Sequence, residues 1–523
     1  MAHVLDAGAR TQSAADIHAI LSRLEEPVHV VRHADGYWLS HDGSGPDGSR
    51  ARRLLALGPL PPERLGSRAF QRAHGVRQSY HTGAMAGGIA SADLVISLAD
   101  RGLLASFGAA GLPADRLEDA LELLGRRLAG RPYACNVIHS PSEPAMERDA
   151  VDACLRHRVR CVEASAFLDL TQEIVRYRAR GLSTARDGRV EITNRIIAKV
   201  SRRETADLFL RPAPPSLLAA LLRGDLITAE QARLAATVPM ADDITAESDS
   251  GGHTDGRPLT VLLGEIIARR DEIGSSYGGR AARVGAAGGI GTPAAAAAAF
   301  AMGADYVVTG SINQACVEAA QSAAVKSMLG AAEMADCEMA PSADMFELGA
   351  GVQVLRRGSM FAARARRLFE LYRGYDSIAD LPGPERAALE RNVFRAPLED
   401  IWVQTRRYFA ERDPAQLERA EGNEKRRMAL VFRWYLGRSS RWATTGAADR
   451  VADYQIWCGP AMGACNTWLR GTYLEPVEAR RAPDLALHIM RGAAFHQRVT
   501  ALRSHGVTPP ARASRYRPLP LEG

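Results

Sequence analysis

A histidine that follows two glycines is the clearest candidate for proton transfer in the sequence. His253 comes after Gly251 and Gly252 in the stretch ESDSGGHT, just beyond a short apolar segment that is expected to be a strand. Imidazole titrates near neutral pH and can give a proton or a hydrogen bond to a developing negative charge. Glycine lets the main chain approach a ligand closely. His253 is therefore the candidate catalytic residue, and an ordinary turn with a surface histidine is the alternative.

Two glycine-containing loops are candidates for binding a phosphate. Gly288 and Gly289 follow the strand-like segment ARVGAA, and Gly310 and Ser311 follow DYVVT and precede INQACVEAA, which is expected to be a helix. Backbone N–H groups at such turns and at helix N-termini favour anions. Residues 289–294 also fit the dinucleotide fingerprint G-x-G-x-x-A. That fingerprint needs an acidic residue at the end of the next strand, whereas Asp305 begins it, so a phosphate-binding turn is preferred.

Further polar or glycine residues occur where other expected strands end. A lysine buried at such a position is costly unless an anion or an electron-rich group lies beside it, and a lysine that extends to the rim is the alternative. These candidate binding residues are Gly83, Ala84, Met85, Asn136 and Lys199.

Eight short apolar segments must position these residues, and helical segments alternate with them. They are YHTGAM, GLLASFG, YACNVIHS, RCVEASAF, RIIAKVS, DDITAESD, ARVGAAGG and DYVVTGS. Helices are expected between them, for example over residues 113–125 and 293–303. This alternation predicts an α/β fold with a parallel sheet, and eight units predict a (β/α)8 barrel (TIM barrel) with its site in the loops after the strands. A doubly wound sheet is the alternative.

The sequence on either side of the barrel segments predicts three further parts. Residues 1–60 form an N-terminal appendage with a flexible, Gly/Ser/Asp-rich connection, and residues 61–343 form the barrel. Residues 344–500, which hold five of the six tryptophans, form a helical domain or lid, and the proline-rich residues 501–523 form a disordered tail.

Composition excludes several classes of protein. The chain has 523 residues, 46% of them hydrophobic, and a formal net charge of +6. No segment is apolar enough for a membrane span, and MAHVLDAGARTQ carries Asp6 and Arg10 in place of an apolar leader, so a cytoplasmic protein is predicted. Seven cysteines without a C-x-x-C pair argue against a disulfide framework and a zinc site. No motif that binds nucleic acid accompanies the basic charge.

Longer motifs resemble one family. GAMAGGIASADLVISL, NVIHSPSEPA, NRIIAKVSR, DSGGHTDGRPL, RVGAAGGIGTPAAAAAAF, VVTGSINQACVEA, VLRRGSMFAARA and DYQIWCGPAMGA, spread over about residues 60–492, resemble the PfaD-type trans-acting enoyl reductases of polyketide and polyunsaturated fatty acid synthases, which are related to nitronate monooxygenases. The resemblance implies an FMN-binding barrel that uses NADPH to reduce an α,β-unsaturated thioester carried on an acyl carrier protein. It also implies an acyltransferase as a further candidate partner.

Two other functions stay open at this stage. A nitronate monooxygenase would use the same barrel and histidine to oxidise nitroalkanes, and a scaffold that binds carrier proteins would have lost the cofactor. A basic cluster in the helical region is a candidate docking surface for an acidic carrier protein, with internal ion pairs as its alternative. It consists of Arg356, Arg357, Arg364, Arg366 and Arg367.

Overall fold

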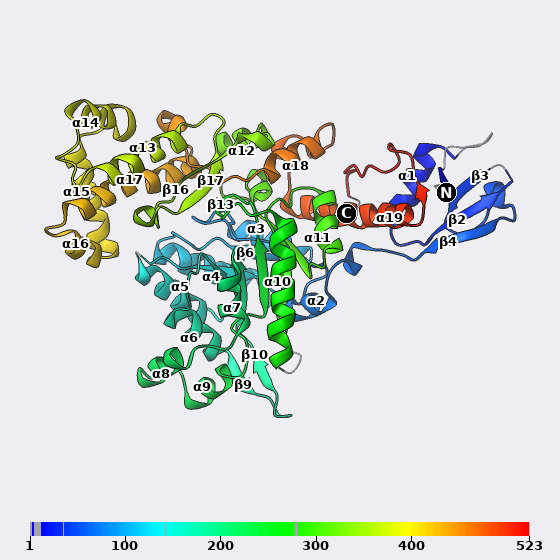
Figure 1. Cartoon of the computed structure of the whole chain (residues 1–523), viewed down its shortest axis with the longest axis horizontal. Coiled ribbons are helices and arrows are strands. Elements are labelled where there is room, and N and C mark those ends of the chain that lie inside the picture. Colours follow the sequence, from blue (N-terminus) through cyan, green and yellow to red (C-terminus); the bar gives the residue numbers. More distant parts are fainter. Residues whose placement is uncertain (1–2, 5–11, 35, 142, 278–280, 522–523) are drawn as a thin grey trace.

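A closed barrel of eight parallel strands forms the centre of the molecule (Figure 1). The computed structural model describes residues 3–4, 12–34, 36–141, 143–277 and 281–521. The barrel strands follow one another in chain order: β5 (Tyr80–Thr82), β6 (Leu104–Phe107), β7 (Ala134–Ile138), β8 (Cys161–Ser165), β11 (Arg195–Val200), β12 (Asp243–Glu247), β14 (Arg283–Ala287) and β15 (Tyr306–Thr309). Each lies within one of the eight predicted segments, which confirms the (β/α)8 fold. The doubly wound alternative is wrong because β15 pairs with β5 and closes the sheet.

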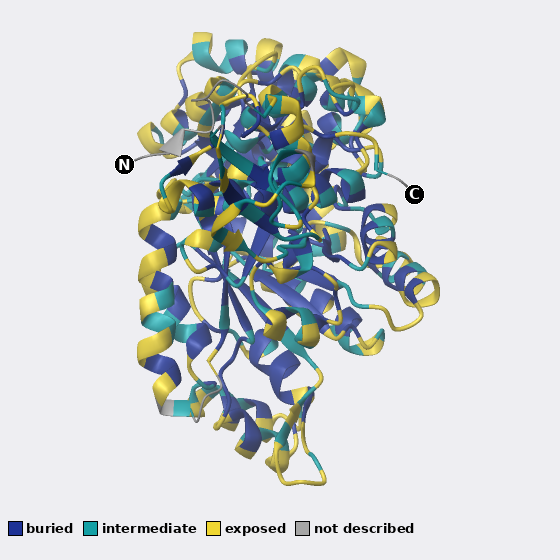
Figure 2. Cartoon of the chain, turned by 90° about the vertical axis from the view of Figure 1, so that its right-hand side faces the viewer, coloured by how far each residue is buried: buried dark blue, intermediate teal, exposed yellow. Residues whose placement is uncertain are grey.

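Helices cover the outside of the barrel, and the strands between them are buried (Figure 2). The outer helices are α3 (Ala92–Asp100), α4 (Ala114–Leu128), α5 (Pro144–Arg156), α6 (Gln172–Arg180), α7 (Arg203–Leu210), α10 (Leu259–Gly274) and α11 (Pro293–Ala301). In α4 the buried leucines 117, 121, 124 and 128 recur at helical spacing. That apolar face continues past Gly125, so the helix ends three residues later than predicted. Between β11 and β12 the chain adds α8 (Pro215–Arg223) and α9 (Ala229–Ala235), and a hairpin of β9 (Leu182–Thr184) and β10 (Val190–Ile192) precedes β11.

The unit after β15 departs from the expected pattern. Residues Ser311–Ala315 form only the 3₁₀ turn η4, and α12 (Ala323–Gly330) begins later, capped by Ser322. The predicted helix over INQACVEAA is therefore wrong. Cys316 takes an extended conformation, and the N–H of Val317 donates to the carbonyl of Arg480 instead of to the preceding turn. The C-terminal helix α19 (Ala482–Ser504) packs against α11 and α3 and so covers the part of the barrel that the missing helix would cover.

A helical domain with its own core projects from the barrel, which confirms the predicted additional helical domain, although the predicted segment 344–500 also includes helices that pack on the barrel. It contains α13 (Phe361–Gly374), α14 (Gly383–Leu389), α15 (Leu398–Arg412), α16 (Ala415–Ala420) and α17 (Glu424–Thr445). Its core is aromatic and includes Phe346, Phe361, Phe432 and Tyr435. A small sheet of β13 (Gly252–His253), β17 (Gly351–Leu355) and β16 (Cys337–Pro341) connects the domain to the barrel. The chain then returns to the barrel through α18 (Ala461–Leu469) and α19.

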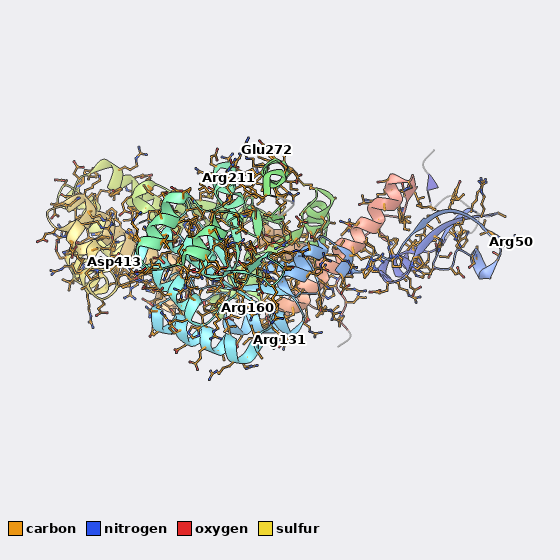
Figure 3. The ribbon with its side chains drawn as sticks, turned by 90° about the horizontal axis from the view of Figure 1, so that it is seen from below. Arg50, Arg131, Arg160, Arg211, Glu272 and Asp413 are labelled. Atoms are coloured by element: carbon orange, nitrogen blue, oxygen red, sulfur yellow. The ribbon has the colours of Figure 1, made fainter. Side chains whose placement is uncertain are left out.

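The N-terminal part is an ordered unit packed on the end of α19. It consists of α1 (Ala14–Ser22) and the antiparallel strands β2 (Val28–His33), β3 (Gly36–Ser40) and β4 (Arg52–Leu57), which begins within the segment expected to be flexible. The buried guanidinium of Arg498 donates to the carbonyls of residues 21, 23, 24 and 26. In Figure 3, Arg50 marks this end of the molecule and Asp413 the opposite, helical end.

The C-terminal segment also differs from the expected disordered tail. Ala513 is buried and its carbonyl lies 3.2 Å from Nδ1 of His18, and the Tyr516 hydroxyl lies 2.8 Å from Nδ1 of His488. Strand β18 (Val507–Thr508) pairs with β1 (His3–Val4). Asp6 and Arg10, on which the prediction about a leader rests, lie outside the described residues. Within the described ranges, the structure has no helix whose length and apolar character would suit a membrane span.

Candidate active site

The carboxyl ends of the barrel strands and the loops that follow them enclose one pocket of about 150 Å³. All twelve residues selected from the sequence line it, although they are spread over more than 220 positions. They are Gly83, Ala84 and Met85 after β5, Asn136 in β7, Lys199 in β11, Gly251, Gly252 and His253 beyond β12, Gly288 and Gly289 after β14, and Gly310 and Ser311 after β15.

One corner of the pocket presents backbone donors without partners. Within the described chain, the N–H groups of Gly288, Gly289, Gly310 and Ser311 donate no hydrogen bond to another protein group. Gly288 has a φ of +82°, and a Cβ there would lie 2.4 Å from the hydroxyl of Ser248. At Gly289 and Gly310 a Cβ would instead enter open space. The corner is therefore shaped by glycine and suited to an anion, but at Ser311 it has a 3₁₀ turn in place of the predicted α-helix.

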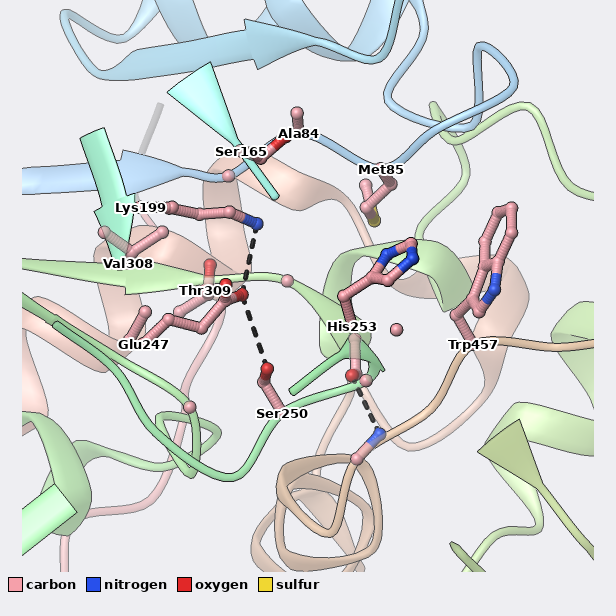
Figure 4. Close-up of a pocket in the computed structure, with 18 of the residues that line it drawn as sticks. Ala84, Met85, Ser165, Lys199, Glu247, Ser250, His253, Val308, Thr309 and Trp457 are labelled. Atoms are coloured by element: carbon pink, nitrogen blue, oxygen red, sulfur yellow. Dashed lines mark hydrogen bonds and ion pairs between the residues drawn. The ribbon is translucent and has the colours of Figure 1, made fainter. Parts of the chain in front are cut away.

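A buried ion network lies at the base of the pocket. Nζ of Lys199 is 3.1 Å from a carboxylate oxygen of Glu247 and 3.6 Å from one of Glu163. Burial alone would lower the pKa of Lys199, but the two carboxylates outweigh it and raise that pKa. Burial likewise favours the neutral form of Glu163, yet Lys199 and then His81 keep its pKa below the usual value. The lysine predicted beside an anion is thus held by anions of the protein itself (Figure 4).

Glu163 organises neighbouring groups and was missed in the sequence. Its side chain is fully buried, and it accepts the N–H of Ala84 at 2.9 Å. The amide nitrogen of Asn136 donates to the carbonyl of Glu163 at 3.1 Å and to the hydroxyl of Ser165 at 2.8 Å. The side-chain oxygen of Asn136 is therefore the group left to accept from a ligand. The one signal in the sequence was a glutamate with apolar neighbours on both sides in the segment RCVEASAF.

His253 is held by a carboxylate that no pattern in the sequence pairs with it. Its Nε2 lies 3.0 Å from Oδ1 of Asp344, and its side chain lines the pocket together with Met85 and Trp457 (Figure 4). Burial would lower the pKa of His253, but the charge and hydrogen bond of Asp344 raise it overall. The residue lies in β13, paired with Val352 of β17, and not directly at the end of β12 as expected. The bend at Gly252, where φ is +84°, allows the chain to turn away from the end of β12 and form β13.

Residues from the far end of the chain complete the wall of the pocket. Trp457, Gly459 and Ala461 line it, and the N–H of Gly459 donates to the hydroxyl of Ser311 at 3.0 Å. A Cβ at Gly459 would lie 2.8 Å from the nitrogen of Gly251. The motif DYQIWCGPAMGA contains these residues, but its spacing alone does not place it against the barrel.

A second, larger cavity opens from the same site. Its volume is about 690 Å³, and it lies between the loops of the barrel and helices α15 and α17 of the helical domain. Ala86, Ile138, His253 and Trp457 line both cavities, so the pocket continues into this groove.

The basic cluster proposed from the sequence as a docking surface is largely neutralised. Arg357 pairs with Asp336, Arg364 with Asp453, and Arg366 with Glu338. Arg367 pairs with Glu370 and Glu385, which leaves Arg356 as the member without a carboxylate partner among the described residues. The alternative of internal ion pairs therefore describes this cluster better.

Comparison with known proteins relates the chain to synthase components. It is 48% identical over 448 residues to a polyunsaturated fatty acid synthase subunit from a Thraustochytrium species, covering 84% of this chain and 30% of that protein. It is 43% identical to the polyketide biosynthesis protein PksE of Bacillus subtilis, covering 85% of this chain and 58% of PksE. The chain thus spans less than two thirds of the length of these relatives.

Structural comparison agrees. The crystal structure of the enoyl reductase domain of MlnA, from the macrolactin biosynthesis cluster of Bacillus amyloliquefaciens, superposes with a TM-score of 0.80 and 38% sequence identity. The match covers 84% of this chain and all of that domain. Residues 375–454 match the family model described as the inserted helical domain of [acyl-carrier-protein] S-malonyltransferase.

The barrel, its strand-end pocket and its sequence identity place the chain in the same family as the enoyl reductase domain of MlnA. The relatives found by sequence are components of polyunsaturated fatty acid and polyketide synthesis, which narrows the family further. The chain belongs to the PfaD-type trans-acting enoyl reductase family.

Proposed function

We propose that this protein is an FMN-dependent reductase that acts in trans and uses NADPH to reduce α,β-unsaturated acyl thioesters on an acyl carrier protein. The observation that supports the proposal most is that three features open into one continuous cavity. An anion-binding corner of unpartnered amides and a histidine held by Asp344 line one pocket, and that pocket opens into a groove large enough for an acyl chain.

The groups around the pocket suit a flavin mononucleotide. The amides at Gly288, Gly289, Gly310 and Ser311 match a phosphate, which accepts hydrogen bonds and favours positive dipoles. The free oxygen of Asn136 matches a ring N–H, and Lys199 brings a positive charge towards an electron-rich ring edge. Gly83, Ala84 and Met85 supply small or apolar surface on one side. When bound, FMN would carry a hydride from NADPH to the β-carbon of the enoyl thioester.

His253 supplies the other half of the reduction. A hydride added to the β-carbon leaves negative charge on the α-carbon and the thioester oxygen. The imidazolium of His253 donates its proton to the α-carbon, so one hydride and one proton replace the π bond with two C–H bonds. Asp344 keeps the imidazole protonated and oriented before this transfer, which is consistent with the raised pKa of His253.

The helical domain supports a carrier protein as the partner. Residues 375–454 resemble a domain of an enzyme that transfers malonyl groups to an acyl carrier protein, and the relatives are synthase proteins with additional length. An acyltransferase is a further candidate partner on the same grounds.

Stopped-flow spectroscopy of His253→Ala tests the proposal. The variant should bind FMN and be reduced by NADPH like the wild type, whereas reoxidation by an enoyl thioester should slow about 10²–10⁴-fold. His505→Ala, at an exposed position outside the pocket, is the control. A loss of less than threefold in reoxidation would contradict the role of His253 as proton donor.

Two outcomes with the wild type would overturn the wider proposal. Oxygen-dependent turnover of nitroalkanes without reduction by NADPH would identify a nitronate monooxygenase. Protein that stays colourless after reconstitution with FMN would identify a scaffold.

A further inference from the structure

The groove between the barrel and the helical domain has an unbalanced charge. Five arginines line it, at positions 116, 412, 433, 438 and 441, against two carboxylates, Glu143 and Asp344. Both carboxylates lie in its interior and are engaged: Glu143 by Arg412 at 3.7 Å and Arg433 at 2.9 Å, and Asp344 by His253. Arg433 also lies 3.6 Å from a carboxylate oxygen of Glu347, so the three remaining arginines are the ones in the groove without a carboxylate partner among the described residues.

These three arginines are exposed and have no carboxylate partner. Arg116, Arg438 and Arg441 are all exposed, and among the described residues no Asp or Glu oxygen lies within 4.0 Å of their guanidinium groups. Arg438 lies over the ring of Trp434, 5.6 Å from its centre, which holds the side chain at the groove without neutralising it. The like charges of Arg438 and Arg441 repel each other, so an anion placed between the two would be favoured.

The elements that carry these residues place them on two walls of the groove. Arg438 and Arg441 are three residues apart on α17, so they share one face of that helix. Arg116 is in the first turn of α4, on the barrel side. The exposed aromatic ring of Tyr408, on α15, lies at the same groove. Unpaired positive charge on two walls of the groove suits a rigid anionic protein whose tethered acyl chain enters the groove.

We propose that Arg116, Arg438 and Arg441 form the docking surface for an acidic acyl carrier protein, whose acyl chain reaches His253 through the groove. The inference rests on the proposed function and replaces the cluster at residues 356–367 as the docking site. The groove is continuous with the catalytic pocket at His253 and Trp457, whereas four of the five arginines in that cluster are engaged by carboxylates of their own chain.

The test compares three substrates with the holoenzyme. They are crotonyl thioesters of an acidic carrier protein, of free phosphopantetheine and of N-acetylcysteamine. For Arg438→Glu/Arg441→Glu we expect kcat/KM with the carrier substrate to fall about tenfold or more relative to kcat/KM with the N-acetylcysteamine substrate. Salt should slow the wild type on the carrier substrate and affect the double variant much less, because screening acts on the same attraction. Arg356→Glu, an exposed arginine outside the groove, is the control and should keep the wild-type ratio.

Each other outcome overturns the inference. An equal loss on all three substrates would mean that the double variant damages the enzyme and not the docking step. An equal loss on the phosphopantetheine and carrier substrates, with the N-acetylcysteamine substrate spared, would assign the arginines to the pantetheine phosphate. A kcat/KM with the carrier substrate within twofold of the wild-type value would show that these arginines do not form a docking surface. Failure of the wild type on every substrate would instead overturn the proposed function.

Discussion

Replacing Lys199 with methionine should destabilise the barrel through the carboxylates that the lysine leaves behind. Methionine keeps much of the apolar stem but removes the ammonium group, which lies 3.1 Å from Glu247 and 3.6 Å from Glu163. Glu163 is fully buried, and its other close partners are the N–H of Ala84 and the ring of His81, 3.6 Å away. Burial lowers the pKa of His81 to about 4, so its imidazole is neutral at pH 7 and cannot replace the lysine charge.

The expected size follows from these contacts. At an effective dielectric constant of about 20, each ion pair contributes roughly 5 kcal/mol of Coulomb energy, much of it offset by the cost of burying the charges. Removing one partner of a buried pair keeps that cost for the other and typically destabilises by about 3–5 kcal/mol. We expect Lys199→Met to lose about this much free energy of unfolding, and Lys199→Met/Glu163→Gln to recover part of it because the neutral amide is cheaper to bury.

Urea unfolding of the apoprotein at pH 7, followed by far-ultraviolet circular dichroism, measures the difference. Lys326→Met, at a partly exposed lysine without a carboxylate partner among the described residues, is the control and should change stability by less than 1 kcal/mol or so. The folded-state pKa of Glu163 is lowered, so its contribution is present above the unfolded pKa and is lost as pH falls through the folded value. The gap between wild type and Lys199→Met should therefore narrow in acid. A stable single variant, or a double variant weaker than the single one, would refute the argument.

Three further predictions concern the pocket and the N-terminal unit. Gly289→Asp should lose bound FMN while the barrel stays folded, because it adds a negative charge beside the anion corner, and Gly289→Asn, which tolerates positive φ, should retain more flavin by absorbance. Asp344→Asn should lower the pKa of His253, so the alkaline fall in the rate of flavin reoxidation should move to lower pH, and an unmoved pH profile would count against the pair. Arg498→Met should remove the donor that the carbonyls of residues 21, 23, 24 and 26 share and so loosen residues 12–57, detected as faster proteolysis there, whereas equal cleavage rates would contradict the proposed anchoring.

The parts predicted from sequence are those that depend on short-range pattern. Most barrel strands are short runs rich in β-branched or small residues, and glycine follows five of them, β5, β6, β12, β14 and β15, so these strands and the pocket residues beside them follow from local chemistry. The helix expected after Ser311 was wrong because a distant group, the carbonyl of Arg480, takes the N–H of Val317. The C-terminal tail was wrong for a similar reason, since its proline-rich composition conceals side chains such as Tyr516 that pack on α19.

Contacts between side chains far apart in the chain could not be predicted from the sequence pattern. Nothing in the spacing of Asp344 relates it to His253, 91 positions earlier, because the antiparallel pairing of β13 with β17 brings them together. Glu163 was passed over because a single charged residue in a strand is not distinguishable from one on a solvated face. Whether the arginines of the basic cluster are ion-paired likewise depends on carboxylates such as Asp453, which come close to them only in the folded structure.

The contact between Gly459 and Ser311 has a consequence for the order in which the molecule matures on the ribosome. The last barrel strand ends at Thr309, and the residue that bonds Ser311 is synthesised 148 positions later. A nascent chain can therefore close its barrel while one wall of the pocket is still unsynthesised, and the whole helical domain is made in that interval. Flavin captured early would meet an open site, so tight retention should begin only after the segment around Trp457 has left the exit tunnel and packed against the barrel.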